Sequence, residues 1–219
     1  MPREAYERAP EPAGYTAIAP ERRSAAHGPA AGDKGPNPVA RYNGLTFGEL
    51  LDRRDALIVD CETTGLGPRA EIVELAAVDT TGMLRFAAPV MPQSRISSDA
   101  SDIHGLTRVR LRELEAKPWP EHHVEVHALL DGRLVIGWNV EFDVRLIRQT
   151  CERYGLQPPC VAWSDVLAFY RKHGPERPSY GLGNVLRAEG LRWEGSAHRA
   201  EADARAVLAI MRKLANYPA

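Results

Sequence analysis

The alternation of apolar and polar positions divides residues 42–219 into strands early in the chain and helices later. Short apolar runs bounded by turn-forming residues predict strands at 56–59, 71–78, 83–90, 134–136 and 161–163. Thr81 and Gly82 separate the second run from the third and predict a hairpin turn. Helical periodicity predicts helices near 122–130 (after Pro118 and Pro120), 140–154, 165–172, 182–189 and 199–214. Strands that come early and then alternate with helices predict an α/β fold with a central mixed β-sheet flanked by α-helices.

The first 40 residues differ in composition from the rest of the chain. Residues 1–40 contain seven Pro, ten Ala and four Gly, with five basic and five acidic side chains and almost no large aliphatic ones. Such a segment cannot bury enough apolar surface to offset the entropy of an ordered chain. We therefore predict a disordered or loosely attached tail over residues 1–41 and one folded domain over residues 42–219.

Composition narrows the class of protein. The chain has 219 residues, 44% of them hydrophobic, and a formal net charge of -1, so it has no broad positive field with which to hold nucleic acid. This balance favours an enzyme with a cation-filled acidic site over a protein that coats nucleic acid by charge. Three sparse cysteines without CxxC spacing predict a reducing, cytoplasmic setting. No apolar stretch approaches the roughly 18 residues of a membrane span, so no membrane association is expected.

Two carboxylates follow the first predicted strand. Asp60 and Glu62 are two residues apart, so they point to the same face of the strand while Cys61 points to the other. Carboxylates held this close repel each other, and a hard divalent cation such as Mg²⁺ or Mn²⁺ would relieve the repulsion. The following Thr63, Thr64 and Gly65 offer hydroxyls and a flexible turn where a phosphate could approach. The alternative is a strand that runs out into an acidic surface turn.

Two further acids lie on the apolar sides of predicted helices. Asp143 falls within the stripe of the 140–154 helix, for which Asn139 stands at the N-cap position. Asp203 lies at the edge of the stripe of the last helix, and His198 precedes that helix in a loop. A carboxylate facing a core needs a partner, a proton or a metal ion. Each could be a buried structural aspartate, but two of them together with the strand pair favour a metal site.

Four segments resemble a known family in order and spacing. LIVDCETTGL at 57–66, VIGWNVEFDVRLI at 135–147 and HRAEADARA at 198–206 resemble the three motifs of the DEDDh 3′–5′ exonucleases, the group of DnaQ-like proofreading subunits and ribonuclease T. DIHGLT at 102–107 is similar to a segment found between their first and second motifs. A histidine five positions before the last aspartate distinguishes this group from the related DEDDy enzymes. The resemblance covers residues 54–214 and implies a ribonuclease H-like fold.

The resemblance also implies a mechanism. It implies hydrolysis of the terminal phosphodiester with two divalent cations, Mg²⁺ or Mn²⁺, and a site that holds the 3′ end of a nucleic acid. His198 would be the general base, since an imidazole suits proton transfer near neutral pH. Phe142 could stack on the terminal base, as in single-strand binders, or pack under its helix. The implied metal ligands are Asp60, Glu62, Asp143 and Asp203, and the implied substrate contacts are Thr63, Thr64, Gly65, His104, Leu106, Asn139 and Phe142. Thr107 could instead mark a helix start in the HGLT segment.

The leading function is a 3′–5′ exonuclease that releases nucleoside monophosphates from DNA, preferably single-stranded, in proofreading, repair or turnover. An exoribonuclease that trims RNA uses the same chemistry, and no residue separates the two. A non-catalytic adaptor that only binds nucleic acid or a protein partner is disfavoured, because every member of the catalytic set is present. Some relatives are dimers, so a homodimer fits the resemblance, and residues 1–40 are the segment available to recruit a protein partner.

Overall fold

The computed structural model of the protein describes residues 41–42 and 45–215. Residues 1–40 lie outside the described part, so the tail predicted over 1–41 stays a prediction, although Arg41 itself lies in a short strand, β1 (Arg41–Tyr42). β1 pairs with β2 (Leu45–Thr46) as a separate two-stranded ribbon ahead of α1 (Phe47–Leu51). In the described part of the chain, no helix is long and apolar enough to cross a membrane.

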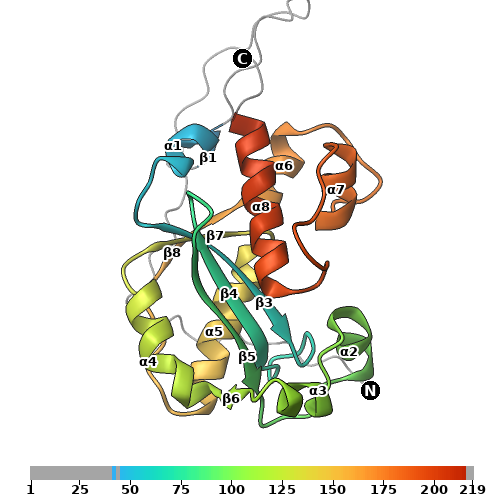
Figure 1. Ribbon diagram of the computed structural model, residues 1–219. Coiled ribbons are helices and arrows are strands. Elements are labelled where there is room, and N and C mark those ends of the chain that lie inside the picture. The colour runs from blue at the N-terminus through green and yellow to red at the C-terminus, as the bar shows by residue number, and fades with distance from the viewer. Residues whose placement is uncertain (1–40, 43–44, 216–219) are drawn as a thin grey trace, which may run out of the picture.

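A six-stranded mixed sheet forms the centre of the molecule, in the order β6-β5-β4-β3-β7-β8 (Figure 1). On one side of β3, the strands β3, β4 and β5 form an antiparallel meander. On the other side, β7 and β8 run parallel to β3. The strand bounds are β3 (Ala56–Thr63), β4 (Ile72–Asp79), β5 (Leu84–Met91), β6 (Lys117–Pro118), β7 (Leu134–Gly137) and β8 (Ala162–Asp165). The predicted α/β fold with a central mixed sheet is confirmed.

Helices cover both faces of the sheet, as Figure 1 shows. One apolar core joins Leu57 and Val59 of β3 to α4 (Trp119–Leu130) and α5 (Val140–Arg153). The other core joins Ala56 and Ile58 to α1 and to three later helices. These are α6 (Val166–His173), α7 (Leu182–Ala188) and α8 (Ala200–Ala215). Successive β3 side chains thus alternate between the two helical layers, as the period of a strand requires.

The predicted elements are all present, with shifted ends. Gly82 forms the predicted hairpin turn with φ of 94°, and its N–H donates to Asp79 O at 2.9 Å. The helix expected after Pro120 begins earlier, at Trp119, because a proline in the first turn of a helix has no N–H bond to lose. Three short helices were not among the predicted elements, namely α1, α2 (Ser98–His104) and α3 (Arg108–Glu113), although a helix start at Thr107 was the alternative that fits α3. Each has too few turns to show a clear apolar period.

Candidate active site

The site lies at the carboxyl end of β3, where the strand carries the predicted acid pair. Asp60 pairs across the sheet with Ala76, and Glu62 pairs with Glu74 of β4. Both acids fall on the same face as Ile58, which packs under α8. The strand therefore turns Asp60 and Glu62 toward the beginning of α8.

Asp203 completes a three-carboxylate cluster from the first turn of α8. Its side chain is buried, and one oxygen from each of Asp60, Glu62 and Asp203 lies within 4.8 Å of the others. Residues separated by more than 140 positions meet because α8 packs along β3 and β4. Clustered carboxylate oxygens are the donors that hard divalent cations prefer, so the donor set fits such an ion.

Asp143 reaches the same strand from the opposite helical layer. It lies in the first turn of α5 and is 4% exposed, and its Oδ1 accepts the Cys61 backbone N–H at 3.0 Å. Asn139 occupies the predicted N-cap position but makes no side-chain capping bond. Its backbone is left-handed (φ 63°), and its N–H donates to Asp165 Oδ1 at 3.0 Å. The turn before α5 is thereby attached to the end of β8.

The electrostatics of the four acids reflect burial together with mutual repulsion. Burial, followed by the charges of Asp143, Asp203 and Glu62, raises the pKa of Asp60 well above its usual range. Burial raises the pKa of Asp143 to about 8, although the Cys61 N–H opposes the rise. Burial and the neighbouring Asp203 charge raise the pKa of Glu62 to about 7, and burial also raises the pKa of Asp203. Without a cation, the folded protein therefore resists full ionisation of this cluster.

His198 lies in the loop just before α8, as predicted. Its side chain is exposed, and its backbone adopts a left-handed conformation with φ of 58°. The backbone N–H of His198 donates to Asp203 Oδ1 at 3.3 Å. The same oxygen accepts the indole N–H of Trp193. One carboxylate oxygen of the acidic cluster therefore also fixes the loop that presents the imidazole.

Glu74 and Arg199 also belong to the site, although neither was predicted from the sequence. Glu74 is 6% exposed and lies directly across from Glu62. Its two carboxylate oxygens accept the Arg199 Nε at 3.1 and 3.0 Å, and one of them accepts the Ala200 N–H at 2.9 Å. This ion pair joins the sheet to the residue that follows His198. An acid in the otherwise apolar run of β4 was the available signal for Glu74.

The turn after β3 contains the predicted Thr63–Gly65 contacts. Thr63 Oγ1 donates to Gly65 O at 2.7 Å and accepts the Gly65 N–H at 3.1 Å, which closes a tight turn. Thr64 N–H donates to Glu71 O at 2.9 Å, and Thr64 Oγ1 accepts the Glu71 N–H at 3.0 Å. Both hydroxyl oxygens thus bond to backbone groups, and Thr64 Oγ1 also accepts from the Ser94 hydroxyl at 3.5 Å, so they shape the turn in this structure.

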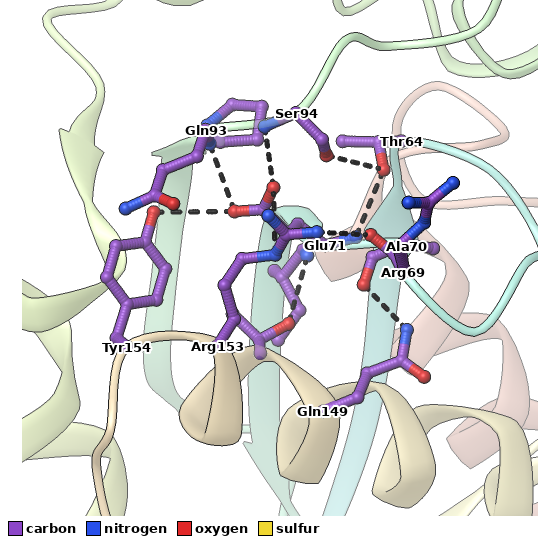
Figure 2. Close-up of polar contacts among 12 residues, drawn as sticks. Thr64, Arg69, Ala70, Glu71, Gln93, Ser94, Gln149, Arg153 and Tyr154 are labelled. Carbon is purple, nitrogen blue, oxygen red and sulfur yellow. Dashed lines mark hydrogen bonds and ion pairs between the residues drawn. The ribbon is translucent and has the colours of Figure 1, made fainter.

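Glu71 fastens this turn to the rest of the domain, as Figure 2 shows. Its carboxylate is 1% exposed and accepts the backbone N–H groups of Gln93 at 3.0 Å and Ser94 at 2.6 Å. The hydroxyl of Tyr154 donates to the same group at 3.3 Å, and Arg153 lies 3.5 Å away. The buried charge therefore ties together the start of β4, the end of α5 and the loop after β5.

The remaining predicted contacts lie beneath or beside this turn. His104 is buried, and its Nδ1 accepts the Leu106 N–H at 3.0 Å, so Nε2 carries the proton and donates to Thr63 O at 3.0 Å. Leu106 is 2% exposed and packs in a small core with Val73. Thr107 caps α3, which was the alternative for this segment. Phe142 is only partly buried, and the Arg145 guanidinium lies 4.9 Å from its ring centroid.

The fold and the carboxylate set define the class of protein as a ribonuclease H-like nuclease domain. The sequence matches the family model of the RNase_T exonucleases over residues 57–211. The uncharacterized exonuclease CP81 of Escherichia phage 186 is 34% identical over 173 residues, which cover 74% of this chain and 88% of the phage protein. The chain belongs to this exonuclease family. It is a 3′–5′ exonuclease acting on nucleic acid, in a family that depends on divalent metal ions.

Two longer proteins contain a similar domain. The 3′–5′ exonuclease DinG of Bacillus subtilis is 26% identical over 177 residues, which cover 77% of this chain and 19% of DinG. The structure of E. coli exonuclease I with single-stranded DNA has a TM-score of 0.61 and 25% identity, and the match covers 73% of this chain and 39% of exonuclease I. The chain therefore spans less than half of either protein, and the resemblance concerns only that part of each.

Proposed function

We propose that this protein removes single nucleotides from the 3′ end of single-stranded DNA by a metal-dependent hydrolysis. The observation that carries the proposal is the convergence of Asp60, Glu62 and Asp203 oxygens within 4.8 Å at the end of β3. Asp143 approaches the same strand end through Cys61 N–H. The likeness to exonuclease I, whose structure contains single-stranded DNA, supports DNA as the substrate.

The acidic residues and His198 would have different roles in the hydrolysis. Asp60, Glu62 and Asp203 would hold one divalent cation and Asp143 would share in holding a second, Mg²⁺ or Mn²⁺ in each case. Such ions supply charge stabilisation of the attacking and leaving oxygens. The exposed imidazole of His198 would take the proton of the attacking water, since its loop is fixed against Asp203.

The terminal nucleotide would lie over the turn at Thr63, Thr64 and Gly65. This turn follows the acid pair directly, and its backbone is held in shape by Glu71. Phe142 and Asn139 flank Asp143 on the side of α5 and would contact the terminal base and sugar. His104 and Leu106 would support the terminal nucleotide indirectly, because the His104 ring bonds to the Thr63 carbonyl of this turn.

The partners and setting predicted from the sequence extend this proposal. A homodimer and a protein partner for residues 1–40 stay predictions. The cytoplasmic setting is also a prediction, and it rests on the sparse cysteines. In the described part of the chain, Cys61, Cys151 and Cys160 are not joined by a disulfide.

The test compares wild type, Asp60→Ala and Glu125→Ala on single-stranded DNA and RNA oligomers labelled at the 5′ end. Reactions contain Mg²⁺, Mn²⁺ or EDTA. Glu125 is a matched control, because it is exposed on α4, away from the acid cluster. We expect a descending ladder that requires metal, survives Glu125→Ala and vanishes with Asp60→Ala.

Three outcomes would contradict parts of the proposal. If RNA is shortened faster than DNA, the substrate is RNA, and the proposed metal-dependent hydrolysis still holds. Full activity in EDTA would remove the metal ions from the mechanism. Intact oligomers under every metal condition would favour the adaptor hypothesis, in which the domain only binds a partner or nucleic acid.

A further inference from the structure

A second feature adjoins the acidic site on the side of α7. It is an open cleft of about 430 Å³ between α7 and the segment that leads to His198. Its lining includes Gly183, Leu186, Arg187, Arg192 and Trp193. A volume of this size falls in the range that holds small-molecule ligands, such as one nucleotide.

Trp193 forms a wall shared by the cleft and the acidic site. Its indole N–H donates to Asp203 Oδ1, so the ring stands between the cleft and the carboxylate cluster. Its far edge fits against Gly183, where an added Cβ would lie 2.4 Å from Cη2 of the indole. A glycine is therefore required at this position of α7 for the indole to occupy its place.

The chemistry of the lining matches a phosphate joined to a base. Arg187 and Arg192 are both exposed and contribute two positive charges beside a site dominated by carboxylates. Guanidinium groups bind phosphate oxygens in a bidentate manner. An indole provides a surface on which any base can stack, and Trp193 lines the cleft.

We propose that this cleft is a subsite for a nucleotide of the substrate strand, on the 5′ side of the terminal nucleotide. Arg187 and Arg192 bind its phosphate, and its base lies against Trp193. The proposal rests on the proposed function, because a strand whose 3′ end lies at the acid cluster must leave past a neighbouring surface. The cleft is next to the acid cluster because Trp193 borders both of them. Arg187 and Arg192 offset the negative charge of the nearby carboxylates.

The first experiment measures kcat/KM for DNA oligomers from a dinucleotide to a decamer. The variants are Arg187→Ala/Arg192→Ala and the control Arg54→Ala/Arg85→Ala, which removes two exposed arginines at the opposite end of the sheet. We expect the ratio of kcat/KM for decamer over dinucleotide to fall at least about 10-fold in the first double variant and to stay within twofold of wild type in the control.

A binding measurement separates the two proposals. For a decamer with a non-hydrolysable terminal linkage, each lost phosphate contact lowers the slope of log affinity against log salt by about 0.7, so two lower it by about 1.4. Failure of wild type to hydrolyse any oligomer would overturn the proposed function, whereas the salt slope would still test the cleft. Equal slopes and equal length dependence in the two double variants would overturn the subsite.

A third experiment tests whether the cleft binds a nucleotide of the substrate strand or a free nucleotide. Equilibrium dialysis with free thymidine monophosphate should detect no saturable binding that depends on Arg187 and Arg192 at concentrations where the decamer binds. If such binding is found while the length dependence is unchanged, the cleft holds a free nucleotide and the assignment to the substrate strand is wrong.

Discussion

At the scale of single residues, the site combines charges that destabilise the fold with partners that position them. Asp60 is placed among Glu62, Asp143 and Asp203, and its pKa is raised by burial and by their charges. Active sites commonly retain such unfavourable groups because function requires them. The cost should be visible in the absence of metal.

Asp60→Asn should stabilise the metal-free protein. The amide keeps the shape of the side chain and removes one charge from the cluster, so we expect the free energy of unfolding in EDTA at pH 8 to rise by about 1–2 kcal/mol. We expect Mg²⁺ to raise the midpoint temperature of wild type but not that of this variant. Thermal unfolding with and without Mg²⁺ measures both effects, and Glu125→Gln on exposed α4 is the control. A less stable Asp60→Asn protein in EDTA would contradict the view that the acids repel each other.

Glu74→Gln should slow turnover more than it weakens substrate binding. Glu74 holds Arg199 and the Ala200 N–H, so the change loosens the segment that follows His198 while leaving the acid cluster intact. Loss of such a supporting partner costs about 10- to 100-fold in metal affinity or activity. We expect the loss in kcat at saturating Mg²⁺, with KM changed less than threefold.

A purely structural role for Glu74 makes a different prediction. In that case Glu74→Gln would lower stability, while kcat per folded molecule would equal that of wild type. Steady-state kinetics combined with urea unfolding of the same preparation distinguishes the two. Arg199→Lys should retain part of the activity, because a lysine keeps the charge opposite Glu74 but not the bidentate geometry.

At the scale of elements, the site depends on the ends of strands and helices and on how they are fastened. The turn after β3 follows the acid pair, and Glu71 joins it to the end of α5 and to the loop after β5 (Figure 2). Glu71 is a charged side chain at 1% exposure whose bonds include two backbone N–H donors. Removing it leaves those donors and Arg153 without their acceptor.

Glu71→Ala should lower the free energy of unfolding by about 3 kcal/mol, the usual cost of leaving buried polar partners unpaired. Urea denaturation measures the change, and Glu113→Ala is the control because that acid forms an exposed ion pair with Arg110. The control should change stability by less than about 1 kcal/mol. Equal losses in the two variants would show that the Glu71 network does not stabilise the turn.

At the scale of the whole molecule, two helical layers approach one strand end from opposite faces of the sheet. α8 brings Asp203 from one layer, and α5 brings Asp143 from the other (Figure 1). Both faces of the sheet are covered by apolar cores, so the buried acids are gathered at this one strand end, where they repel one another. The stability of the entire domain should therefore respond to their ionisation.

Stability in EDTA should fall as pH rises from about 6.5 to 8. Glu62, with a pKa of about 7, and Asp143, with a pKa of about 8, retain protons in the folded chain at pH values where the unfolded chain has released them. The folded state then binds more protons, so the free energy of unfolding decreases with pH. We expect Mg²⁺ to replace these protons and to flatten the decrease. Urea midpoints at pH 6.5, 7, 7.5 and 8, with EDTA or Mg²⁺, test this, and a rising midpoint in EDTA would contradict it.

The sequence by itself determined which side chains could share a face. Asp60 and Glu62 had to point the same way because side chains alternate along a strand, and Asp143 had to face a core because of its place in a helical period. The early strands and later helices also predicted the mixed sheet. The short α1, α2 and α3 were not predicted as elements because five to seven residues show little periodicity, and Thr107 marked a possible start for α3 alone.

Only the tertiary structure decided which distant groups meet. Glu74 lies opposite Glu62 because of the register of β3 and β4, and it pairs with Arg199, 125 positions away, because α8 packs on that sheet. The Trp193 bond to Asp203 and the neighbouring cleft likewise depend on how α7 docks beside α8. Register and docking are set by the summed packing of both cores, and no local pattern of apolar and polar residues encodes that sum.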